Sequence, residues 1–204
     1  MKNVLTDLHI ITGIILAHLL LFFSFQDRAI FWYIFSGSIL ILIIYAAILQ
    51  ENVEDKASLS KYLIIGIMSG ALLYVIFWLG DQFFAILNLP FNNSISKLYH
   101  WFAPSLFWHY LALFLIAAPG EELFWRGFIQ KRLAKYLKPS WSIVTGALLY
   151  ASANSYAGSF LLVLASFISG LAWGFLYWWK RSMPLVIVSH ITFDILIFII
   201  LPLS

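Results

Sequence analysis

Two adjacent carboxylates, Glu121 and Glu122, follow an apolar run from Leu111 to Ala118. A charge inside a lipid bilayer costs on the order of 3 kcal/mol even on permissive scales, so it needs a partner or a function. Arg126 follows Glu122 by one helical turn, where a carboxylate–guanidinium pair can form. Glu121 points roughly 100° away on the same helix and lacks that partner. The spacing predicts a structural role for Glu122 and leaves Glu121 for chemistry.

Three further polar residues, Asn154, His190 and Asp194, lie in later apolar runs. His190 and Asp194 are four residues apart and therefore share a helix face. Polar side chains within a membrane face the interior of the helix bundle, so we expect these groups to meet the glutamates. The set fits water activation, because a buried carboxylate can take a proton from water and N–H groups can stabilise an oxyanion. The plainer alternative is that the two glutamates end a transmembrane helix in water.

The elements that must position these residues are transmembrane helices. The chain has 204 residues, of which 63% are hydrophobic and 10% are charged, and its mean hydropathy is +0.93. Soluble domains are about 45–50% apolar and about 25% charged. We therefore predict an all-α, polytopic membrane protein that forms a single integral membrane domain over residues 1–204. The absence of cysteine excludes disulfides, thiolate metal ligands and cysteine nucleophiles.

Seven apolar segments predict a bundle of about seven spans, several of them close to the roughly 20 residues that cross a bilayer. The expected spans are 8–25, 30–49, 62–79, 105–118, 141–156, 160–179 and 185–201. Residues 81–103 contain Pro90 and the pair Asn92 and Asn93. This composition predicts an interfacial loop or a short surface helix, either a plain connector or a lid over a site.

Basic residues predict the orientation in the membrane. With seven spans, Arg28 and Lys97 fall on one side and the other ten of the 12 Lys and Arg residues fall on the side of the N-terminus. These ten are Lys2, Lys56, Lys61, Arg126, Lys131, Arg132, Lys135, Lys138, Lys180 and Arg181. Positive charge concentrates on the cytoplasmic side. We therefore expect a multi-pass protein of the cell membrane with a cytoplasmic N-terminus, an external C-terminus and no nucleic-acid partner.

The motifs resemble those of the CPBP family, the CAAX-protease and bacteriocin-processing (Abi) intramembrane endopeptidases. Residues 121–126 match its EExxxR motif, and residues 150–154 lie where the family has FxxxH. Residues 170–194 look like its last block, which normally ends in HxxxN. The order and spacing of the three motifs in consecutive spans carry the resemblance. It covers about 111–204, which would hold the catalytic core.

The resemblance implies a type II CAAX-protease-like bundle and a glutamic endopeptidase without a cofactor. Its substrate would be a membrane-anchored peptide or protein, such as a prenylated-like or sorting tail or a peptide precursor. The family roles fall on Glu121 (general base on water), Glu122 and Arg126 (helix geometry), Asn154 (water position), and His190 and Asp194 (oxyanion hole).

Two positions depart from the family pattern, since Asn154 replaces a histidine and Asp194 replaces an asparagine. An asparagine can hydrogen-bond a water but cannot take its proton, and an ionised aspartate cannot donate to an oxyanion. We expect Asp194 instead to accept a hydrogen bond from the His190 ring and orient it.

Two alternatives to a glutamic protease stay open. A metal-dependent enzyme would bind zinc through Glu121, Glu122, His190 and Asp194, although the sequence has no HExxH-type helix. The other is a non-catalytic immunity or scaffold protein, or a small transporter, that retains the fold.

Overall fold

The computed structural model describes residues 4–49, 55, 58–87 and 92–203. Every element within these ranges is a helix, apart from an isolated antiparallel bridge between Asp55 and Ser182. The predicted all-α class is therefore confirmed. Lys2 and Lys56, which entered the charge count, and Pro90, which entered the loop prediction, lie outside the described residues.

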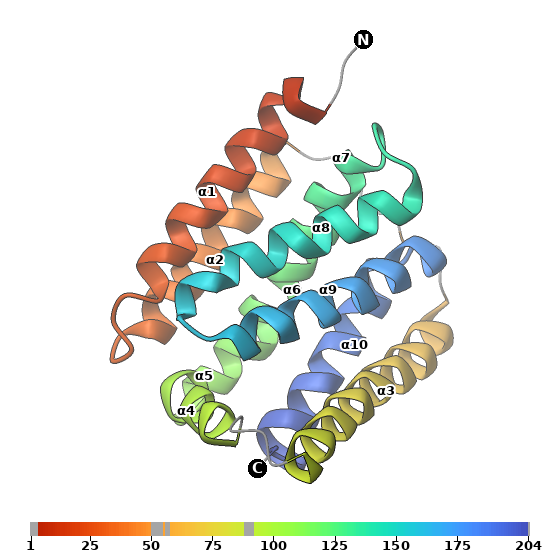
Figure 1. The fold of residues 1–204 in the computed structure, drawn as a ribbon. Helices are drawn as coiled ribbons and strands as arrows, with labels where there is room; N and C mark the ends of the chain where they lie inside the picture. The colour runs from red at the N-terminus through yellow and green to blue at the C-terminus, as the bar shows by residue number, and fades with distance from the viewer. Residues whose placement is uncertain (1–3, 50–54, 56–57, 88–91, 204) are drawn as a thin grey trace.

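The helices pack as neighbouring pairs around a central helix. In chain order the elements are η1 (Val4–Thr6), α1 (Leu8–Ser24), α2 (Phe31–Ile48), α3 (Leu59–Ile86), α4 (Asn92–Phe102), α5 (Phe107–Ala112), η2 (Leu113–Ala117), α6 (Ala118–Glu122), η3 (Leu123–Gln130), α7 (Lys131–Leu133), α8 (Pro139–Ala153), η4 (Asn154–Ala157), α9 (Phe160–Lys180), α10 (Met183–Ile195) and η5 (Leu196–Ile200). Helix α1 packs along α2, α8 along α9, and α3 along α10 (Figure 1).

The elements from α5 to α7 form one continuous helix, Phe107–Leu133, which we call the central helix. It contacts α2, α8, α9 and α10 and therefore lies where most of the bundle meets. Two π-helical stretches, η2 and η3, flank α6, the segment that carries both glutamates. The wider π turn of η2 comes immediately before Pro119, which has no N–H to give to a regular helix. π-Helical turns of this kind are frequent at functional sites.

The predicted number of spans is not confirmed. Among the described residues, only α2, α3, α9 and α10 with η5 are long and apolar enough to cross a membrane. A fifth span is counted if α4 and the central helix, which meet at a bend of 95°, are taken together. Helices lie at all seven predicted places, but α1 and α8 are short and the central helix contains charged residues. The protein is nevertheless a multi-pass membrane protein.

The segment 81–103 is more helical than the loop prediction allowed. Helix α3 continues through Asp81 to Ile86, so this part of the prediction is wrong. Helix α4 agrees with the predicted short helix. Its Tyr99 hydroxyl donates to the Ile197 carbonyl at 2.8 Å and accepts from the Leu203 amide at 3.1 Å. These bonds fix α4 to the C-terminal end of the chain.

A polar clamp joins the far end of the central helix to the start of α1. Asp7 caps α1 and accepts hydrogen bonds from Arg132 Nη1 and Tyr136 Oη, each at 3.1 Å. Burial alone raises the pKa of Asp7, but hydrogen bonds from Tyr136 and the Ile10 amide and the charge of Arg132 hold its pKa below its ordinary value.

Two pairs of glycines, four residues apart on α3 and on α9, allow close helix approach within the chain. A Cβ on Gly66 would lie 2.8 Å from Val188 of α10, and a Cβ on Gly70 would collide with the Ser189 carbonyl oxygen. Gly170 and Gly174 lie in the same way against α8 and the central helix. These contacts account for the glycines without a second copy of the chain.

We predict that Gly70→Ala destabilises the protein by about 1–3 kcal/mol, the usual cost of overpacking, because α3 must move away from α10. The measurement is the thermal unfolding midpoint in detergent. Gly37→Ala is the matched control, since its added Cβ would meet no atom within 4 Å. Equal midpoints for the two variants would contradict the tight α3–α10 contact.

Candidate active site

The glutamates are held where the central helix touches α2. A Cβ on Gly120 would collide with Ile39 and lie 2.7 Å from Ile43, so only glycine lets the two helices approach this closely. Glu122, two residues on, is 0% exposed, and Glu121 is 8% exposed. The backbone of α6 is therefore fixed immediately before both carboxylates.

Glu122 is the hub of a buried polar network. Its Oε1 accepts a hydrogen bond from Arg126 Nη1 at 3.0 Å, which confirms the predicted pair. The same oxygen lies 2.8 Å from His190 Nδ1 on α10. Because an ionised carboxylate only accepts, the hydrogen bond assigns a proton to Nδ1 and turns Nε2 the other way. Glu122 thus fixes both the central helix and the histidine ring.

Glu121 faces a different set of groups. Its Oε1 accepts a hydrogen bond from the Tyr150 hydroxyl at 3.3 Å, and its Oε2 lies 3.9 Å from His190 Nε2. The sequence prediction that Glu121 does not share the Arg126 pair agrees with this geometry. The prediction from the sequence did not include Tyr150 among the site residues. The sequence does show that Tyr150 precedes Asn154 by four residues, one helical turn.

His190 is oriented by Glu122 and not, as expected, by Asp194. Asp194 Oδ2 lies 3.7 Å from His190 Nε2, which is too long for a hydrogen bond, and it accepts none from the described residues. Trp173 of α9 stacks on the imidazole with ring centroids 3.8 Å apart, a contact that no sequence spacing signalled. The Trp173 Nε1–H donates in turn to Ser189 Oγ at 3.3 Å.

Asn154 lies beyond the last residue of α8, at the start of η4, and not within a span as predicted. It is buried, and its Nδ2 donates to the Tyr150 carbonyl at 3.0 Å. The structure therefore places Asn154 one turn from Tyr150 and gives it no hydrogen bond to Glu121.

A cavity of about 210 Å³ brings the predicted residues together. Its polar lining includes Glu121, Tyr150, Asn154, His190 and Asp194, and most of the remaining wall is apolar. Four helical elements contribute these five groups, and the sequence predicted that all of them except Tyr150 would face one place. The cavity therefore brings two carboxylates and an imidazole into one wall.

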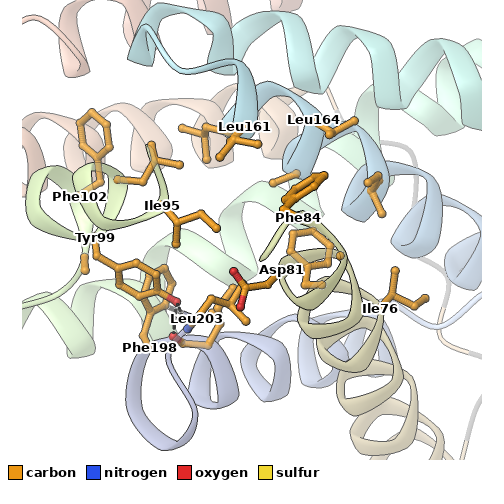
Figure 2. Close-up of a pocket in the computed structure, with 18 residues that line it drawn as sticks. Ile76, Asp81, Phe84, Ile95, Tyr99, Phe102, Leu161, Leu164, Phe198 and Leu203 are labelled. Atoms are coloured by element: carbon orange, nitrogen blue, oxygen red, sulfur yellow. Dashed lines mark hydrogen bonds between the residues drawn. The ribbon is translucent and has the colours of Figure 1, made fainter. Parts of the chain in front are cut away.

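A second cavity, which we call the apolar chamber, adjoins the first. It has a volume of about 240 Å³ and lies between α3, α4, α9 and the C-terminal end of the chain. Figure 2 shows its side chains converging from these elements, with the Asp81 carboxylate among them. The two cavities share the side chains of Phe77, Phe102, Leu162, Ala165, Ile197 and Phe198. An apolar group in the chamber would therefore lie next to the polar site.

The residues suggested as metal ligands are not arranged as a ligand set. The described part of the chain contains no group of three His, Cys, Asp or Glu side chains that could hold a metal ion. Glu122 Oε1 is already bound by both Arg126 and His190. The set Glu121, Glu122, His190 and Asp194 therefore does not fit zinc in this arrangement.

We predict that Glu122→Gln lowers the free energy of unfolding by about 3–5 kcal/mol, because it leaves the buried Arg126 guanidinium without its counter-charge. Glu121→Gln, which removes no such pair, is the control and should unfold close to wild type. Denaturation in detergent followed by tryptophan fluorescence measures the difference. The two variants would unfold alike if the ion pair contributed nothing.

A protein-family model matches the part of the chain that carries the polar lining of the cavity beside Glu121. The family model described as Type II CAAX prenyl endopeptidase Rce1-like matches residues 103–196, which include every site residue named from the sequence. No curated protein and no solved structure matches the chain. Residues 103–196 are therefore similar to an Rce1-like domain, which supports a relationship between this protein and the CPBP, or CAAX-protease, family of membrane endopeptidases.

Proposed function

We propose that this protein hydrolyses a peptide bond of a membrane-associated substrate with water activated by Glu121. The family relationship supports a protease of the membrane. The observation that carries the mechanism is the position of Glu121, whose Oε2 lies 3.9 Å from His190 Nε2 in the wall of a cavity of about 210 Å³. A carboxylate and an imidazole at this separation can flank one reacting water and carbonyl.

In the proposed reaction Glu121 takes a proton from water while the water oxygen bonds to the peptide carbonyl carbon. The carbonyl π electrons move to oxygen and form the tetrahedral oxyanion. Collapse of this intermediate breaks the C–N bond, and Glu121 returns its proton to the departing amine nitrogen. The products are a carboxylic acid and an amine, and Glu121 regains its starting state.

The other residues would act around this step. His190 in its doubly protonated form donates from Nε2 to the oxyanion, because Nδ1 is engaged with Glu122. Asn154 hydrogen-bonds the water, and Asp194, 3.7 Å from His190 Nε2, attracts the charged ring. Glu122 and Arg126 hold the central helix and the ring in register.

The apolar chamber supports a substrate that carries a hydrocarbon group or an apolar tail, such as a prenylated-like or sorting tail. Its position beside the polar site allows the apolar part of the substrate to sit between α3, α4 and α9 while the peptide bond reaches Glu121. Apolar groups gain about 25 cal/mol for each Å² removed from water, so a chamber of this kind favours lipid-linked peptides over soluble ones.

The start of α1 and the C-terminal end of the chain lie at opposite ends of the bundle (Figure 1). We propose that the N-terminal end faces the cytoplasm, since the seven-span arrangement expected from the sequence puts ten of the 12 Lys and Arg residues on that side.

We predict that the purified protein in nanodiscs cleaves an internally quenched peptide with a farnesylated cysteine followed by three residues. Glu121→Gln should reduce kcat by about 10²–10⁴-fold, the usual contribution of a general base, without loss of folded protein. Strong chelators should leave the wild-type rate unchanged.

Each other outcome of this experiment has a definite meaning. Inhibition by chelators that zinc reverses would favour a metal-dependent enzyme. A rate that Glu121→Gln leaves intact would refute the proposed mechanism. No cleavage by the wild type, with activity gained only in Asn154→His, would favour a non-catalytic immunity, scaffold or transport protein, because that change restores the family's histidine.

A second prediction concerns the chamber. Gly80 lines it, and a Cβ at this position would meet no atom within 4 Å, so Gly80→Phe fills the space without displacing the backbone. We expect KM for the farnesylated peptide to rise about tenfold while kcat/KM for the same peptide without the lipid stays within twofold. Gly37→Phe on α2, away from the chamber, is the control. Equal KM values for Gly80→Phe and wild type would show that the lipid binds elsewhere.

A further inference from the structure

Tyr150 supplies the hydrogen bond that Glu121 receives within the described part of the chain. Its hydroxyl donates to Glu121 Oε1 at 3.3 Å, and the other carboxylate oxygen remains turned toward His190. The separation is longer than the usual 2.7–2.8 Å of an O–H···O bond. Such bonds in ligand-free catalytic sites often shorten once the reactants are bound.

The tyrosine side chain is itself held on several sides. Its ring lies 5.5 Å from that of Trp125, and the Arg126 guanidinium carbon lies 4.9 Å from its centroid. A Cβ on Gly170 of α9 would lie 3.5 Å from Tyr150 Cδ1, so this helix closes a further side. With 6% of its surface exposed, the ring has little freedom to turn the hydroxyl away from Glu121.

Asn154, the other polar residue of this motif, does not hydrogen-bond Glu121. Asn154 follows Tyr150 by one turn, but its Nδ2 donates to the Tyr150 carbonyl. In the FxxxH pattern the polar group stands at the position of Asn154, and the position of Tyr150 carries an unreactive phenyl ring. In this chain the group that hydrogen-bonds Glu121 is therefore at the first position of the motif, one turn before Asn154.

We propose that Tyr150 is a positioning residue for the reaction, which holds Glu121 so that Oε2 faces the attacking water. This inference rests on the proposed role of Glu121 as the base. The hydroxyl fixes one carboxylate oxygen, and the other keeps the lone pair that takes the proton. Through its ring, Tyr150 also links Glu121 to Arg126 and so to the network that orients His190.

The test is Tyr150→Phe, which keeps the ring and removes only the hydroxyl. With the farnesylated peptide in nanodiscs we expect kcat to fall roughly 10- to 100-fold, the effect of losing a hydrogen bond to a charged group, while KM stays within twofold. Tyr156→Phe is the matched control. It removes a tyrosine hydroxyl bonded to His18 Nδ1 at 3.0 Å, outside the site, and should keep the wild-type kcat.

The outcomes separate this inference from the proposed function. A wild-type kcat in Tyr150→Phe, with Glu121→Gln inactive, would overturn the role of Tyr150 alone. Activity in Glu121→Gln would instead refute the base on which the inference rests. A kcat loss in Tyr150→Phe that the unfolding midpoint fully accounts for would also overturn the inference, because it would reduce the tyrosine to a packing residue.

Discussion

The buried guanidinium of Arg126 is the centre of the contacts that join the central helix, α8, α9 and α10. It is 2% exposed and forms its ion pair with Glu122, which is 0% exposed. Desolvating two charges costs several kcal/mol each, so their neighbours must offset that cost. The rings of Tyr150 and Trp173 lie 4.9 and 5.4 Å from the guanidinium carbon, and each provides a cation–π contact. These contacts join the central helix to α8 and α9, and Glu122 extends them through His190 to α10.

The same network separates two chemically identical neighbours. Glu122 Oε1 is saturated by Arg126 and His190, so that carboxylate has a fixed position and no open approach for substrate. Glu121 precedes Glu122 by one residue, so its side chain points to a different side of the helix and borders the cavity. Its Oε1 accepts a hydrogen bond from Tyr150, and its Oε2 lies 3.9 Å from His190 Nε2. A difference of one residue along a helix is thus enough to assign one glutamate to architecture and the other to a polar cavity.

The sequence predicted the interactions that depend on local spacing and missed those that depend on packing between helices. The Glu122–Arg126 pair follows from i,i+4 geometry, and the all-α class follows from composition. Trp173 stacks on His190 from another helix, and no periodicity encodes that contact. The role expected for Asp194 was wrong for the same reason. Its spacing put it within reach of His190, but the shorter contact came from Glu122 on a different helix.

The two departures from the family motifs, Asn154 and Asp194, both change which hydrogen-bond donors and acceptors line the cavity. Asparagine in place of histidine removes a proton acceptor, and aspartate in place of asparagine replaces an amide donor with an acceptor. The amide at Asn154 is committed in part to the Tyr150 carbonyl, so the cavity also loses donor capacity there. Three carboxylates then face one imidazole, with Arg126 as the permanent cation among them. The Tyr150 hydroxyl returns one donor to this set, at the oxygen of Glu121 that no other side chain contacts by hydrogen bond among the described residues. Together, Asn154, Asp194 and Tyr150 redistribute the hydrogen-bond donors within one cavity, and the two substitutions are not independent losses.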